Sequence, residues 1–133
     1  MNSMFKYLSF SFIGFLFSTF SIVAVDLSNG QVGSAGASCI GGSIIISDIH
    51  PGIGAIHTQS YWSSANQNNA SELMDEDYSP YEIIEYLESN DVSNNPFIRQ
   101  YGIVDMYNGI NYGYLFEDEC NDIPNTNWSG EIG

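Results

Sequence analysis

The pattern of hydrophobic and polar positions predicts two β-hairpins, one in the first half of the chain and one in the second. The first covers residues 19–39, where strand-forming residues lead into Asn29-Gly30 and a run of small residues follows. The second pairs residues 98–106 with residues 111–116 around another Asn-Gly dipeptide. This dipeptide accepts the positive φ angles of a tight turn, so both hairpins have a turn of the right chemistry.

Two further strands are predicted between the hairpins. A run of three isoleucines indicates a buried strand over residues 43–48, because a short continuous β-branched run is typical of a strand covered on both faces. A turn follows at residues 49–52, which contain a Pro-Gly pair, and residues 53–60 form the next strand.

Two helices are predicted next. Residues 64–74 suit a rather polar helix, and a clearer helix begins at Ser79, with Pro80 in its first turn and Glu82 completing a capping box. Three apolar residues then form a buried stripe and three glutamates face water (Ile83, Ile84, Leu87; Glu82, Glu85, Glu88). Hairpins separated by a helical pair predict an α+β fold with antiparallel sheets.

Length and composition indicate a single domain with a strong negative charge. The 133 residues, of which 44% are hydrophobic, fit a single domain with a packed core. The chain has 16 acidic residues against only two cations, Lys6 and Arg99. The negative electrostatic field of such a chain repels the phosphate backbone of nucleic acids, so we expect no nucleic acid among the partners.

Residues 1–18 have the three parts of a secretory signal peptide. A short segment carries one lysine, residues 7–17 are apolar, and the small residue Ser18 precedes the predicted cleavage site. Cleavage leaves a domain of residues 19–133, which we expect to be secreted or periplasmic. The alternative is an uncleaved membrane anchor, because residues 7–25 form an uncharged run of 19 positions that is long enough to span a bilayer.

Cleavage at this site would make Thr19 the first residue of the mature chain. An N-terminal threonine carries a nucleophilic hydroxyl and a basic α-amine on one residue. The chain therefore predicts a hydrolase-type site at Thr19 if the signal is removed, and an ordinary strand residue if it is not.

Cysteines and histidines are the remaining candidates for chemistry. In an exported chain Cys39 and Cys120 are candidates for a disulfide, and the alternative is two free thiols. His50 and His57 flank a Pro-Gly turn and fit no standard metal spacing, so we predict structural or binding roles for them. We expect no metal site and no cofactor.

Four segments, taken in order, resemble a known family. They read TFSIVAVD at residues 19–26, GSAGAS at 33–38, HPGIGAIHTQ at 50–59 and RQYGIVD at 99–105, and Cys120 follows them. These motifs resemble the DUF1028 family, which is biochemically uncharacterised and is grouped with the N-terminal nucleophile (Ntn) hydrolases. The resemblance implies the αββα sandwich of antiparallel sheets that this class shares.

The resemblance also implies roles for individual residues. Thr19 would be the nucleophile and, through its α-amine, the base that cleaves a C–N amide bond of an unknown small molecule or peptide. Gln59 and Ser60 would lie near the oxyanion donors, and Ser38 would be a polar orienting group.

This chain departs from the pattern of the class in two ways. Related sites use a lysine to tune the nucleophile, but the only cation after residue 18 is Arg99, which could pair with an acid such as Asp105. Family domains also continue past the point where this sequence ends, which implies an incomplete sandwich with open edges and a homo-oligomer as a candidate assembly. The alternative function is a non-catalytic exported binding domain, or an inactive truncated copy of the fold.

Overall fold

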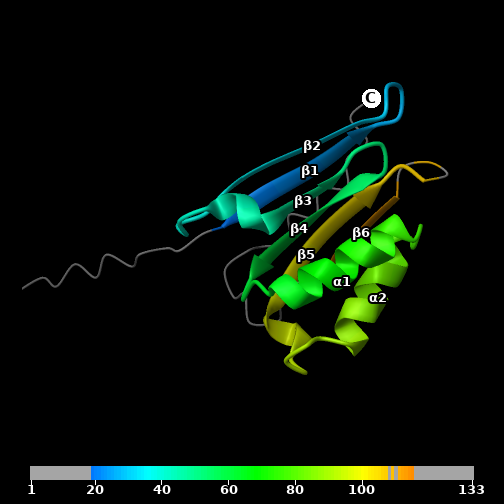
Figure 1. Cartoon of the computed structure of the whole chain (residues 1–133). Coiled ribbons are helices and arrows are strands. Elements are labelled where there is room, and N and C mark those ends of the chain that lie inside the picture. Colours follow the sequence, from blue (N-terminus) through cyan, green and yellow to red (C-terminus); the bar gives the residue numbers. More distant parts are fainter. Residues whose placement is uncertain (1–18, 108, 110, 116–133) are drawn as a thin grey trace, which may run out of the picture.

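The computed structural model describes residues 19–107, 109 and 111–115. Within them the chain forms a two-stranded sheet, a four-stranded sheet and two α-helices (Figure 1). The predicted signal peptide and Cys120 lie outside the described residues. All strand pairs are antiparallel, so the predicted α+β class is confirmed.

The first predicted hairpin is confirmed. Strand β1 (Phe20–Asp26) pairs with β2 (Gln31–Ala37), and the register runs from Phe20 opposite Ala37 to Asp26 opposite Gln31. The turn between them ends at Gly30, whose φ of 71° is a conformation that side chains disfavour. Along β1 the odd-numbered residues are half-buried and the even-numbered residues are exposed, as expected of a strand covered on one face.

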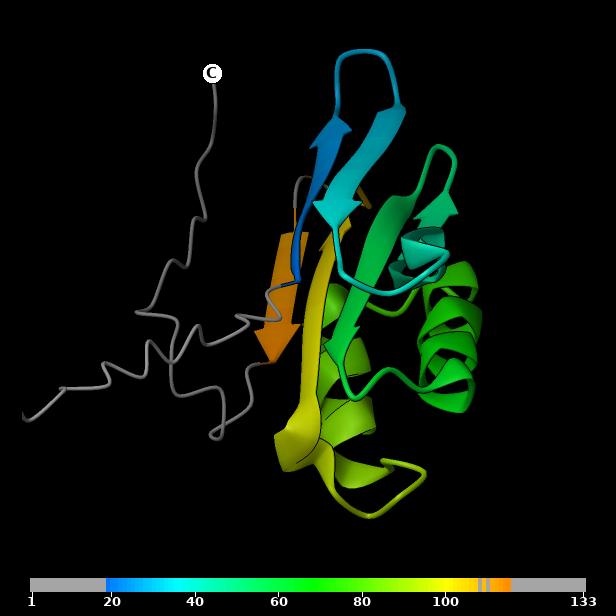
Figure 2. The same cartoon turned by 90° about the vertical axis from the view of Figure 1, so that its left-hand side faces the viewer.

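The predicted buried strand at residues 43–48 is wrong. Ser43–Ile46 form a short 3-10 helix, η1, and β3 (Ser47–His50) begins only after it. Of the three isoleucines only the last is buried, and Ile44 is 77% exposed. The chain has to leave one sheet and enter the other here, and it does so through η1 (Figure 2). A continuous isoleucine run does not by itself distinguish a strand from a helical turn.

The four-stranded sheet has the strand order β3-β4-β5-β6. Its other strands are β4 (Gly54–Ser60), β5 (Arg99–Asp105) and β6 (Asn111–Leu115), close to the predicted ranges. The turn between β3 and β4 starts only at Pro51, later than predicted, because β3 continues through His50. The second predicted hairpin, β5 with β6, is confirmed.

Both predicted helices are present. They are α1 (Ser64–Asp75) and α2 (Pro80–Ser89), and α2 begins with the predicted capping box between Ser79 and Glu82. The predicted apolar stripe of α2 is buried, and it packs against α1 and the helix-facing side of β4 and β5. The core consists of Ile56, Ala70, Met74, Ile83, Ile84, Leu87, Tyr101 and Ile103.

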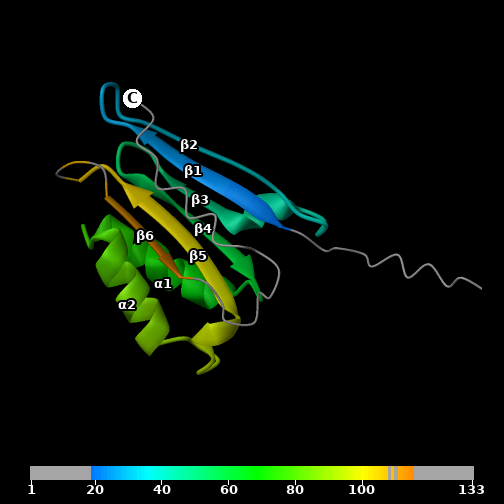
Figure 3. The same cartoon turned by 180° about the vertical axis from the view of Figure 1, so that it is seen from behind.

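The elements are arranged in layers (Figures 1 and 3). The two helices cover one face of the four-stranded sheet, and the β1–β2 hairpin packs on the other face. The outer face of this hairpin is apolar and exposed, with Phe20 at 63% and Ile22 at 62%. Residues 20–25, part of the uncharged run behind the anchor hypothesis, belong to β1. In the part of the chain that the structure describes, no helix has the length and hydrophobicity needed to cross a membrane.

Candidate functional site

Thr19 and Ser38 lie opposite each other at the open end of the first hairpin. Thr19 directly precedes β1 and Ser38 directly follows β2, so the antiparallel register brings the two residues together. The Oγ1 atom of Thr19 and the Oγ atom of Ser38 are 2.8 Å apart, and both residues are half-buried. The residue predicted as nucleophile and the residue predicted as orienting group are therefore hydrogen-bonded to each other.

Gln59 reaches the same hairpin from the four-stranded sheet. Its Nε2 atom donates a hydrogen bond to the Oγ atom of Ser21, which lies two residues beyond Thr19 on the same face of β1. Gly36 stands opposite Ser21, and a Cβ atom there would lie 3.2 Å from the Ser21 Cβ, so a glycine makes room for this serine. Sequence reasoning missed Ser21, although the two-residue period of a strand places it beside Thr19.

Ser60 ends β4 with an unusual backbone conformation. Its φ of 59° lies in the left-handed region, which residues other than glycine rarely adopt. The chain therefore turns sharply out of the sheet directly after Gln59. Of the four predicted site residues, Thr19 and Ser38 are in contact, and Gln59 is connected to them through β1, with Ser60 next to it in the chain.

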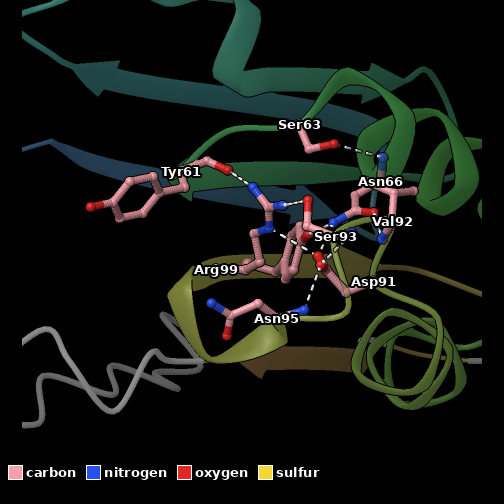
Figure 4. A network of polar contacts seen from close by, with 9 residues as sticks. Tyr61, Ser63, Asn66, Asp91, Val92, Ser93, Asn95 and Arg99 are labelled. Carbon is pink, nitrogen blue, oxygen red and sulfur yellow. Dashed lines mark hydrogen bonds and ion pairs between the residues drawn. The ribbon is translucent and has the colours of Figure 1, made fainter.

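Arg99 pairs with Asp91, so the predicted pair with Asp105 is wrong. The Nε atom of Arg99 lies 2.9 Å from the Oδ2 atom of Asp91. Its Nη2 atom donates to the Ser93 hydroxyl at 3.0 Å, and its Nη1 atom donates to the backbone carbonyl of Tyr61 (Figure 4). Asp105 is at the other end of β5, and an extended strand separates residues six positions apart by about 20 Å.

Asp91 is the centre of this buried network. Its Oδ1 atom accepts hydrogen bonds from the backbone N–H of Ser93 at 2.9 Å and of Asn95 at 3.0 Å, and its Oδ2 atom accepts one from Asn66. Burial raises the pKa of Asp91, but the hydrogen bonds to its carboxylate, first among them that from Arg99, lower the pKa by a larger amount. The net result is a pKa of about 2. Sequence reasoning missed Asp91, because its partners come from separate segments and no sequence pattern points to it.

The Arg99 network lies on the helix side of the four-stranded sheet. Arg99 and Tyr101 share one face of β5, and the Tyr101 hydroxyl accepts a hydrogen bond from Asn66 of α1 at 2.9 Å. Gln59 instead bonds to β1 on the opposite side of the sheet. The one cation among the described residues is thus engaged on the face of the sheet away from Thr19 and Ser38.

The comparison with known families identifies the fold unit that carries this geometry. The model of a family of unknown function, DUF1028, matches residues 19–116. The chain belongs to the DUF1028 family. The match begins at Thr19 and extends over both sheets and both helices, so the resemblance predicted from the motifs is confirmed. No curated protein and no solved structure matches this DUF1028 chain significantly.

The two histidines of this DUF1028 domain have different surroundings. The Nδ1 atom of His50 lies 2.7 Å from a carboxylate oxygen of Asp75, and its Nε2 atom lies 3.2 Å from the Ser71 hydroxyl, so His50 ties β3 to α1. His57 is 2% exposed, and neither of its ring nitrogens has a hydrogen-bond partner among the described residues. A structural role accounts for His50, whereas His57 requires a separate explanation.

Cys39 follows the candidate site in the chain. It is exposed, and it has no disulfide partner within the described residues. Cys120 lies outside those residues, so the pairing of the two cysteines stays a prediction.

Proposed function

We propose that this DUF1028 protein is an exported Ntn-type hydrolase with Thr19 as its nucleophile. Removal of residues 1–18 frees the α-amine, which takes the proton of the Thr19 hydroxyl while the oxygen attacks the carbonyl carbon of an amide. The C–N bond then breaks, and the proton passes to the departing amine. Water, deprotonated by the same α-amine, hydrolyses the threonine ester and restores the hydroxyl. The substrate is a small molecule or a peptide, and the reaction takes place outside the cell or in the periplasm.

The contact between the Thr19 and Ser38 hydroxyls, at 2.8 Å, is the observation that carries this proposal. A nucleophile needs a fixed direction of attack, and a hydrogen bond to a neighbouring strand end supplies one. Support also comes from the family match, which starts at Thr19 itself and so leaves the predicted signal segment outside the family domain.

The proposal assigns the oxyanion site to backbone N–H groups near Gln59 and Ser60. The left-handed conformation of Ser60 supports this assignment, because unusual backbone angles cluster at functional sites. The order of layers among the described residues, two helices on one sheet and a second sheet on its other face, supports an αββα sandwich. In such a sandwich, further helices would cover Phe20 and Ile22.

A non-catalytic exported binding domain is the second candidate. After residue 18 the chain has no lysine, and Arg99 is engaged by Asp91 on the other face of the sheet. The described residues therefore supply no cation that would tune the Thr19 hydroxyl. In this alternative, the same fold holds a ligand without cleaving it.

The first test identifies the N-terminal residue of the exported protein. The full chain with its own N-terminus is expressed in an export-competent host, and the mature form is analysed by mass spectrometry. We expect it to begin at Thr19. Hydrolysis of a fluorogenic amide library is then compared for the wild type and for Thr19→Ser and Thr19→Ala. We expect Thr19→Ala to lose about 10³-fold or more in rate, because the nucleophile is gone, and Thr19→Ser to keep part of the activity.

The matched control is Ser28→Ala, which removes an exposed hydroxyl at the other end of the same hairpin and should leave the rate unchanged. The rate should also rise as the pH passes the pKa of an α-amine, near 8, because only the unprotonated amine is a base. A mature chain that begins at another residue, or an unchanged rate in Thr19→Ala, would disprove the hydrolase proposal. A correct N-terminus without hydrolysis of any amide would favour the binding domain.

A further inference from the structure

A cavity of about 160 Å³ lies between the two sheets beside η1. His57 lines it together with serine and isoleucine residues, which are Ser34, Ser43, Ser47, Ile44 and Ile46. These residues come from β2, η1, β3 and β4, so both sheets contribute to the walls. Because Ile44 is 77% exposed, the cavity opens to solvent on the η1 side.

His57 is one of the residues that line this cavity, and both of its ring nitrogens are unpaired among the described residues. His57 lies two residues before Gln59 and therefore on the same face of β4, and because Gln59 bonds to β1, His57 also points toward the hairpin. Both nitrogens are buried without a hydrogen-bond partner in the described part of the chain. A buried polar group without a hydrogen-bond partner lowers the stability of the folded state, so a protein seldom keeps one without a use for it.

The chemistry of the lining limits what can bind there. Burial lowers the pKa of His57, so the imidazole is neutral at neutral pH and offers one N–H donor and one acceptor nitrogen. Apart from the neutral His57, no acidic or basic side chain of the described residues lines the cavity, so a charged ligand would be desolvated without a counter-charge. The volume is close to that of engineered cavities of about 150 Å³ that bind benzene, so the ligand is small.

We propose that this cavity is a binding site for a small uncharged ligand of the primary-carboxamide class, and that His57 is its recognition residue. The carboxamide has both a donor and an acceptor, so one of them bonds to a ring nitrogen in whichever tautomer is present. The alkyl part of the ligand contacts the isoleucines of η1.

The serine hydroxyls complete the site. Ser34 and Ser47 are hydrogen-bonded to each other and line the cavity from the two sheets. The nitrogens of His57 have almost no exposed surface, so a ligand reaches the ring only after a neighbouring side chain rotates. Rotation of one serine opens the way and frees a hydroxyl, which bonds to the second polar group of the carboxamide.

This proposal does not depend on the chemistry proposed at Thr19. The cavity lining includes Gly36, two residues before Ser38, so the two sites are neighbours along β2. Binding is nevertheless measured without turnover, and the walls of the cavity contain neither the Thr19 hydroxyl nor the α-amine.

The test uses three probes of nearly the same shape on the full chain. Isobutyramide has a donor and an acceptor, 3-methyl-2-butanone has only an acceptor, and isobutyrate is charged. The imidazole resonances of His57 are followed by NMR during each titration, with His50, which is bonded to Asp75 and Ser71, as the internal control. We expect isobutyramide to shift the His57 resonances saturably without moving those of His50, and the other two probes to bind at least about 10-fold more weakly.

The matched variant is His57→Phe, which keeps an aromatic ring and removes both nitrogens. We expect its affinity for isobutyramide to fall at least about 10-fold. The absence of a saturable His57 shift with isobutyramide, or a ketone that binds as tightly as the amide, would overturn the proposal. Both of these readings come from the wild-type protein and so do not depend on the folding of the variant. Conversion of the probe to isobutyrate would appear in the same spectra and would report on the hydrolase proposal separately.

Discussion

At the scale of single residues, three non-glycine residues in the described part of the chain have a left-handed backbone conformation near the ends of elements. These are Ser60 at the end of β4, Asp77 after α1 and Asn94 before the 3-10 turn Pro96–Ile98. Asp77 occupies a Schellman motif, because the N–H of Tyr78 bonds to the carbonyl of Leu73 at 3.0 Å and the N–H of Asp77 bonds to that of Met74 at 3.2 Å. This position is normally taken by glycine.

The Schellman motif predicts that Asp77→Gly stabilises the protein. The left-handed conformation, with a φ of 64°, is strained for an L-residue, and the Asp77 side chain is exposed. We expect the free energy of unfolding to rise by about 0.5–1 kcal/mol, measured by urea denaturation of the full chain. Asp77→Ala is the control: it removes the same charge but keeps the Cβ atom, and it should give no gain. An equal gain in both variants would assign the effect to charge.

The candidate site was predictable at this scale only in part. Thr19 and Ser38 stand out because the predicted export signal and the family motifs point to them, and their contact follows from the hairpin register. Ser21 and Asp91 carry no such signal. Asp91 becomes visible only when the fold brings Arg99 and Asn66 to its carboxylate.

At the scale of elements, the clearest predictions depended on local chemistry that tertiary structure does not override. The capping box fixes the start of α2, and the turn that ends with Asn29-Gly30 closes the first hairpin, so these elements form where predicted. The isoleucine run at residues 43–48 had no such marker. The first part of this run forms a 3-10 helix because the chain passes here from one sheet to the other, and this crossing is set by the topology and not by the isoleucines.

The close packing of β4 against β5 predicts that Gly54 cannot be replaced by a larger residue without a loss of stability. A Cβ atom there would lie 2.2 Å from the carbonyl oxygen of Val104 and 2.9 Å from the Cα atom of Asp105, so the strands would have to separate. We expect Gly54→Ala to lower the free energy of unfolding by about 2–3 kcal/mol, measured by chemical denaturation.

The same sheet provides the matched control for this prediction. Gly102 lies on β5, and a Cβ atom there meets nothing within 4 Å among the described residues. We expect Gly102→Ala to change stability by less than about 0.5 kcal/mol. Similar losses in both variants would mean that the sheet rejects any added side chain, and that the close approach at Gly54 is not the cause.

At the scale of the whole molecule, buried and partly buried polar contacts connect the layers. Gln59 and Ser21 join the two sheets, His50 joins β3 to α1, and Arg99 with Asp91 joins β5 to the segments that follow β4 and α2. The sequence predicted the α+β class and the buried stripe of α2, whereas a layered sandwich was implied only by the family resemblance. It did not predict these contacts, because each depends on side chains that the finished fold brings together.

The Arg99–Asp91 pair predicts how the stability of the whole molecule depends on pH. The folded-state pKa of Asp91, about 2, is below that of an unfolded aspartate, near 3.8. The folded state therefore favours the ionised carboxyl, and this stabilisation is complete above about pH 5 and is lost as the pH falls from about 4 to about 2. A difference of this size corresponds to about 2 kcal/mol.

The measurement is a series of urea denaturation curves between pH 6 and pH 2, together with an NMR titration of the Asp91 carboxyl carbon. We expect Asp91→Asn to be less stable by about 3–5 kcal/mol at pH 6, because it leaves the Arg99 charge buried without its partner. The difference in the free energy of unfolding between variant and wild type should narrow by about 2 kcal/mol toward pH 2, because protonation then neutralises the wild-type carboxyl as well. A gap that stays constant with pH, or a carboxyl that titrates near pH 4, would show that the ion pair does not hold the layers together in this way. The NMR titration is made on the wild type alone, so it decides the question even if the variant fails to fold.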